Sequence, residues 1–164
     1  MKGIAWTLYA LHHGELGLAE DLLAVAERHR AEHEIRHVAT DLARWSREHA
    51  ARLAGIAPHY GRDLTGPAGS SAHSVAATVR AKTAEDRDRR PEPGLLLLHD
   101  LRALYLSASD NSIHWEMLAQ AAQATRDGRL LNAASSCHPQ TLRQVRWANT
   151  MIKNFAPQLL PSAG

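Results

Sequence analysis

The sequence predicts an all-α protein, a four-helix bundle made of two helical hairpins that are joined by a long connection. In four separate segments, apolar residues recur at gaps of three and four, the spacing that places side chains on one face of a helix. No segment shows the alternation of apolar and polar residues that is typical of a half-buried strand. The length of 164 residues suits a single domain.

The first predicted helix covers residues 3–28, and Gly14 and Gly17 are its weak points because glycine is a poor helix former. Its core face is apolar except for one carboxylate: Ile4, Leu8, Leu11, Glu15, Leu18, Leu22, Val25 and His29. A buried carboxylate is costly unless it is paired. Glu15 is therefore the first candidate for a site in the bundle interior.

The second predicted helix covers residues 34–57 and ends before Pro58. Its face carries one imidazole among mostly apolar residues: Ile35, Val38, Leu42, Trp45, His49, Arg52 and Ile56. The phase of the apolar face slips between residues 28 and 34, so we predict a short turn there instead of one continuous helix.

The long connection covers residues 58–93. Residues 65–71 are rich in Gly, Pro and Ser, residues 80–93 are charged and end in prolines, and a short helix fits residues 74–83. Connections of this length are uncommon unless they cross the molecule or cover part of it. Both a crossover topology and a simple up-down-up-down topology remain open.

The third predicted helix covers residues 95–126 and stops at Asp127-Gly128, and the fourth covers 139–156, beginning at Pro139 and ending before Pro157. The tail from residue 157 is expected to fray. The third face reads Leu97, Leu101, Leu104, Ala108, Asn111, Trp115, Leu118 and Ala122. The fourth reads His138, Leu142, Val145, Asn149, Ile152, Ala156 and Leu159.

The four faces thus contain Glu15, His49, Asn111 and Asn149 as polar interruptions. A helix rises about 1.5 Å per residue, so antiparallel packing of the first two helices brings Glu15 level with His49. With a crossover, further polar residues of the last two helices reach the same level. The candidate polar layer with its flanking tryptophans is Glu15, His49, Asp110, Asn111, His114, Asn149, Trp45, Trp115 and Trp147.

On these residues the chain resembles the ferritin-like superfamily over residues 3–57 and 95–157. In its di-iron members the first helix of each pair supplies a Glu and the second supplies Glu-x-x-His. Glu15 matches the first position and His49 the histidine, but Ser46 stands at the carboxylate position, and residues 146–149 read Arg-Trp-Ala-Asn. The degenerate motif implies the fold and argues against ferroxidase chemistry.

The layer allows several uses. Glu15 and His49 form a structural core pair, or they bind one metal ion with Asp110 or His114, a donor set that suits Fe, Mn or Zn. The three tryptophans would line a small-molecule pocket in a third interpretation. We expect a bundle protein without ferroxidase chemistry that uses this layer for structure or for binding a small ligand, with a metal-dependent oxidoreductase as one alternative and an interaction scaffold as the other. The scaffold would expose Leu16, Leu23, Leu130 and Leu131.

The charge balance, the apolar runs and the cysteine count limit the classes of partner and the compartment that we expect for the protein. Lys and Arg total 19 against 17 Asp and Glu, and this balance is too even for a nucleic-acid-binding surface. The apolar run to Leu11 is too short for a membrane span, and no small-residue cleavage site of a leader peptide follows it. The single cysteine, Cys137, excludes an internal disulfide and fits a reducing compartment. We expect a cytoplasmic homodimer, and the abundance of Ala and Arg is typical of high-GC bacteria.

Overall fold

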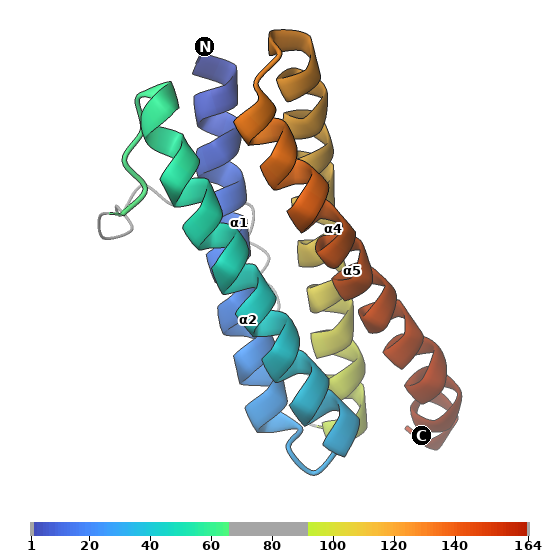
Figure 1. The fold of residues 1–164 in the computed structure, drawn as a ribbon. Coiled ribbons are helices and arrows are strands. Elements are labelled where there is room, and N and C mark those ends of the chain that lie inside the picture. Colours follow the sequence, from blue (N-terminus) through green and yellow to red (C-terminus); the bar gives the residue numbers. More distant parts are fainter. Residues whose placement is uncertain (1, 66–91, 164) are drawn as a thin grey trace.

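The computed structural model of the protein describes residues 2–65 and 92–163. Within them the chain forms α1 (Lys2–Arg28), α2 (His33–Ile56), the short 3-10 helix η1 (Ala57–Tyr60), α4 (Pro93–Thr125) and α5 (Gly128–Ser162) (Figure 1). These residues include no strand, so the all-helical class is confirmed. The helix expected at 74–83 falls outside the described residues.

Helix α1 packs against α2 and α4, while α5 packs against α4 and α2. Helices α1 and α4 run antiparallel, because Glu15 bonds to Asn111 whereas the later Arg28 bonds to the earlier Asp100. Helices α2 and α4 run in the same direction (Figure 1). The end of α2 and the start of α4 therefore lie toward opposite ends of the bundle (Figure 1).

The fourth helix is longer than predicted. It begins at Gly128, not at Pro139, because the Asp127 side chain accepts hydrogen bonds from the backbone N–H groups of Arg129 and Leu130 and caps the helix. Arg126, the residue before Asp127, adopts the left-handed conformation with φ 57° and ends α4.

The three prolines after this cap do not end the helix. All three are exposed and lie inside α5, which continues to Ser162 instead of fraying from residue 157: Pro139, Pro157 and Pro161. A proline leaves the carbonyl four residues before it without its helical partner. For Pro139 this is the carbonyl of Ser135, an exposed residue, so water can take the place of the lost bond.

The predicted core face of α5 is also wrong by one position, a rotation of about 100°. Its inward side is made of small or amide side chains with few large apolar ones: Leu130, Ala133, Ala134, Cys137, Thr141, Gln144, Ala148 and Met151. Leu142, predicted to be inside, is 41% exposed. In α4, by contrast, all eight residues of the predicted face are buried. In α2 the predicted Arg52 is exposed.

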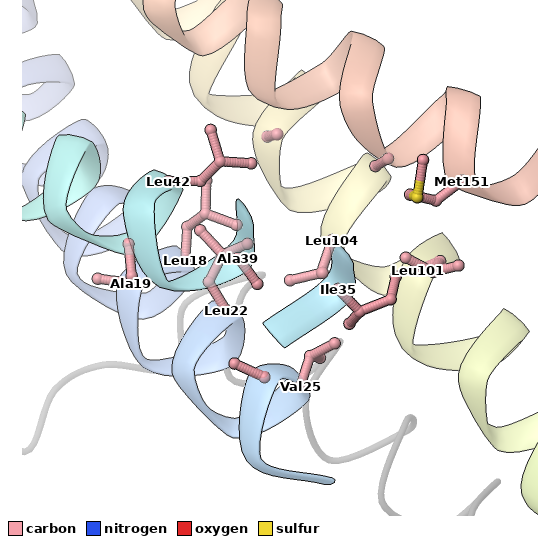
Figure 2. Close-up of a cluster of buried hydrophobic side chains, with 14 of the residues drawn as sticks. Leu18, Ala19, Leu22, Val25, Ile35, Ala39, Leu42, Leu101, Leu104 and Met151 are labelled. Carbon is pink, nitrogen blue, oxygen red and sulfur yellow. The ribbon is translucent and has the colours of Figure 1, made fainter. Parts of the chain in front are cut away.

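The apolar core consists of two clusters. Figure 2 shows the first, where Leu22 of α1, Ile35 of α2 and Leu101 of α4 meet near the α1–α2 turn. The second lies toward the other end and includes Leu8, Leu53 and Leu130. Among the described residues seven polar side chains are buried, and six of them come from helix positions between the two clusters: Glu15, Ser46, His49, Asn111, Thr141 and Gln144.

The seventh buried polar residue, Asp100, joins α4 to the end of α1. Arg28 donates two hydrogen bonds of 3.1 Å to its carboxylate, and His29 Nε2 lies 2.7 Å from Oδ2. The Asp100 side chain has no exposed surface, while that of Arg28 is 29% exposed. His29 and Arg28 are thus anchored to α4.

We expect Asp100→Ala to lower the free energy of unfolding by about 1–3 kcal/mol, because it leaves two donors without their buried acceptor. Asp41→Ala is the control, since Asp41 pairs with Arg44 on the surface and both side chains are more than half exposed. That pair should contribute less than about 0.5 kcal/mol. Urea unfolding of both variants measures the difference, and equal losses would contradict the anchoring role of Asp100.

Candidate functional site

The centre of the candidate site is a hydrogen-bonded pair between α1 and α2. His49 Nδ1 lies 2.6 Å from Glu15 Oε2. Glu15 is 0% exposed and His49 is 2% exposed. The rings of His49 and Trp115 pack edge to face, with centroids 5.9 Å apart and an interplanar angle of 84°. The pair is thus enclosed by α1, α2 and α4.

Two amide side chains extend the pair to the other helices. Asn111 of α4 donates from Nδ2 to Glu15 Oε1 over 2.9 Å, and His49 Nε2 lies 2.7 Å from the amide oxygen of Gln140 on α5. An amide oxygen only accepts, so His49 Nε2 carries a hydrogen. The second ring nitrogen faces a carboxylate, and one further proton is therefore shared between Nδ1 and Glu15.

A second branch of the network also reaches α5. Ser46, one helical turn before His49, is close enough to the Glu15 carboxylate to lower its pKa. Gln144 donates to Ser46 Oγ over 2.9 Å and to the backbone carbonyl of Leu42 over 3.0 Å. Each of the four long helices thus contributes at least one side chain to the network.

The hydrogen-bonding capacity of the layer is not completely used. Within the described part of the chain, Trp115 Nε1 and Gln144 Oε1 are buried without a hydrogen-bond partner. Both are neutral groups, for which an unmet bond costs less than it would for an ion. The ionisable members, Glu15 and His49, have partners at both carboxylate oxygens and at both ring nitrogens.

Gly14 provides the space for Asn111. A Cβ atom at position 14 would lie 2.3 Å from Asn111 Oδ1, far inside van der Waals contact. The sequence presented this glycine only as a weak point of α1. Its missing side chain lets α4 bring an amide up to the α1 backbone and so to Glu15.

Burial and hydrogen bonding shift the pKa values of the pair. Burial raises the pKa of Glu15, and the bonds from His49, Ser46 and Asn111 oppose this only in part. For His49, burial lowers the pKa, but the bond to Glu15 and its charge outweigh burial and raise the pKa above 6.5. Because the pKa values of both Glu15 and His49 are raised, the folded protein holds a proton that the unfolded chain releases near neutral pH.

Three residues predicted for the layer lie elsewhere. Asp110 is exposed, and His114 is held beside it, with Nδ1 2.9 Å from the Asp110 backbone carbonyl. Asp110 precedes Asn111 and His114 comes three residues after it, but both point away from the core face that carries Asn111 and Trp115. Asn149 follows buried Ala148 and is only half-buried. Asp110 and His114 are thus not brought together with Glu15 and His49.

The three tryptophans do not share one pocket. Trp45 and Trp147 pack against the first apolar cluster, whereas Trp115 belongs to the second. The exposed patch expected for a scaffold is not formed either: Leu16 is 40% exposed, but Leu130 is fully buried.

Three members of the layer were missing from the predicted site: Ser46, Gln140 and Gln144. In the sequence Ser46 stands out only because it replaces the carboxylate of the Glu-x-x-His motif. Gln140 and Gln144 are four residues apart and so lie on one helix face, a spacing that could have indicated a shared polar site. The apolar pattern of α5 predicted instead a core face that is shifted by one position.

Two observations limit the chemistry of the layer. Across residues 2–65 and 92–163, no three His, Cys, Asp or Glu side chains are close enough together to hold a metal ion. Burial raises the pKa of the Cys137 thiol to about 11, so this cysteine is not a thiolate nucleophile at neutral pH.

Comparison of the chain with protein-family models, with curated proteins and with solved structures found no match. None of the described helices combines the length and apolarity that crossing a bilayer requires.

We predict that Gly14→Ala destabilises the protein by about 1–3 kcal/mol, because the new methyl group displaces Asn111. Gly55→Ala is the matched control: a Cβ there meets no atom within 4 Å, so the better helix propensity of alanine should stabilise the protein by roughly 0.5–1 kcal/mol. In a double-mutant cycle, Asn111→Ala should remove most of the penalty at position 14. Additive effects in urea unfolding would refute the close contact.

We also predict that stability falls as pH rises above 6.5. The folded state then binds more protons than the unfolded state, so the free energy of unfolding has a negative slope with pH, at most about 1.4 kcal/mol per pH unit for one proton. Urea unfolding at several values between pH 6.5 and 8.5 measures this slope. The variant Glu15→Gln should flatten it, while Asp110→Asn, at an exposed carboxylate, should leave it unchanged. A slope of zero in the parent protein would rule out the shared proton.

Proposed function

We propose that the protein is a ferritin-like bundle that is not an enzyme, in which the polar layer is a structural element. The observation that carries this proposal is that the ionisable pair is closed. Both carboxylate oxygens of Glu15 and both ring nitrogens of His49 are used inside the layer, and neither side chain reaches solvent.

The positions of the layer residues support the ferritin-like part of the proposal. Glu15 on the first helix faces Ser46 and His49, three residues apart on the second. The third helix contributes Asn111, and the fourth contributes Gln140 and Gln144. The contacts of α1 with α4 and of α2 with α5 are compatible with two helical pairs joined by a crossover.

The residues do not fit the di-iron centre that this resemblance implies. Such a centre uses four carboxylates and two histidines. The hydrogen-bonded layer has one carboxylate, one histidine, three amides and a hydroxyl: Glu15, His49, Asn111, Gln140, Gln144 and Ser46. Neutral amides retain hydrogen-bonding capacity but do not offset the charge of two metal ions. A one-metal oxidoreductase would require Asp110 or His114 as a ligand, and both lie off the layer.

Metal analysis of protein purified without chelators tests this proposal. We expect Fe, Mn and Zn each far below one equivalent, and a melting temperature that does not change when these ions or EDTA are added, because a bound ion would stabilise the fold by mass action.

The variants Glu15→Gln and Asp41→Asn provide the comparison, since each removes one carboxylate, buried in the first case and exposed in the second. A near-stoichiometric metal that Glu15→Gln loses and Asp41→Asn retains would overturn the structural assignment in favour of a metal site.

A further inference from the structure

Helix α4 is apolar on two opposite faces. One face is the buried stripe that contains Leu104 and Asn111. On the other, Leu106 is 41% exposed, Ile113 is 60% exposed and Met117 is 44% exposed. These residues are separated by seven and four positions, which aligns them along the helix. A helix that is apolar all round is typical of one that is covered on both sides, and an aligned exposed stripe is typical of an interaction surface.

The outer stripe is self-complementary about Leu106. Arg102 lies four residues before Leu106 and Asp110 lies four residues after it, and both are exposed. Leu95 and Met117 lie eleven residues before and after it. Two copies of α4 that cross antiparallel at Leu106 therefore bring each Arg102 level with Asp110 of the other copy. This pairing of opposite charges is what a two-fold interface requires. Asp110 also lies 3.6 Å from His114 of its own helix, and its side chain is still 56% exposed.

The shape of the surface agrees with this register. A groove of about 530 Å³ lies beside the start of α4 and is lined by Leu95, Leu98, His99, Arg102, Ile152, Ala156 and Leu160. In the antiparallel pair, Met117 of the second copy lies level with Leu95 and thus with this groove. The unbranched, flexible side chain of methionine suits an irregular apolar gap.

We infer that the outer face of α4 binds a second copy of this chain, with the two α4 helices antiparallel, Leu106 on the two-fold axis, and Arg102 of each copy paired with Asp110 of the other. The inference goes beyond the proposed function and does not depend on the polar layer, because its residues face away from the core. Its tests measure mass and crosslinking, so they can fail while the metal-free assignment stands.

A charge-swap series in sedimentation equilibrium tests the inference. The chain of 18.0 kDa should sediment at twice this mass at micromolar concentration. Arg102→Asp and Asp110→Arg, made singly, each place like charges at both symmetric positions and should weaken the dimer at least tenfold. The double variant exchanges the two charges and should restore it. Asp41→Arg, an exposed charge reversal on α2, is the control and should have no effect.

A cysteine on the axis provides a second measurement. Leu106→Cys should crosslink to its own copy under mild oxidation, whereas Arg44→Cys on α2 should not; the natural Cys137 is buried and unreactive. A monomer at all concentrations, whether or not it captures another protein, would overturn the inference. So would a dimer that is indifferent to the single charge reversals or that fails to crosslink through position 106.

Discussion

A carboxylate with no exposed surface is the constraint on which the rest of the structure depends. Glu15 lies in the middle of the apolar face of α1, where an unpaired charge would be very costly. His49 and Asn111 supply its hydrogen bonds, Ser46 lies close to it, and Gln140 and Gln144 in turn bond to His49 and Ser46. Since a shift of any helix by one turn would break at least one of these bonds, the network selects one register for the bundle.

Several local features follow from this constraint. The apolar core is divided into two clusters because the polar side chains occupy the levels between them. Gly14 lies in α1 where Asn111 approaches, and α5 turns small and amide residues inward because they bond to the layer or fit around it. The layer also explains why a histidine can remain protonated in the core: its proton is shared with a carboxylate 2.6 Å away.

Spacing in the sequence was enough to identify the faces of α1 and α4, where large apolar residues recur regularly and the polar exceptions Glu15 and Asn111 stand out. It failed on α5, whose inward positions hold Ala, Thr and Gln while Leu142 faces outward, so counting apolar residues selected a neighbouring face. Pro139 was interpreted as a helix start because a proline usually marks one. The true start depends on the Asp127 side chain. Position along the helix axis favours Asp110 and His114 as members of the layer, but a one-residue step on a helix turns a side chain by about 100°.

The most direct test of the central claim is proton NMR of the histidine ring in protein labelled with nitrogen-15 at histidine. If Glu15 and His49 share a proton inside a closed layer, the His49 ring should show N–H signals at both nitrogens that exchange slowly with solvent and persist above pH 7, and the Nδ1 signal should disappear in Glu15→Gln. A His49 ring whose N–H protons exchange rapidly and which titrates near its ordinary value of 6.5 would contradict the account.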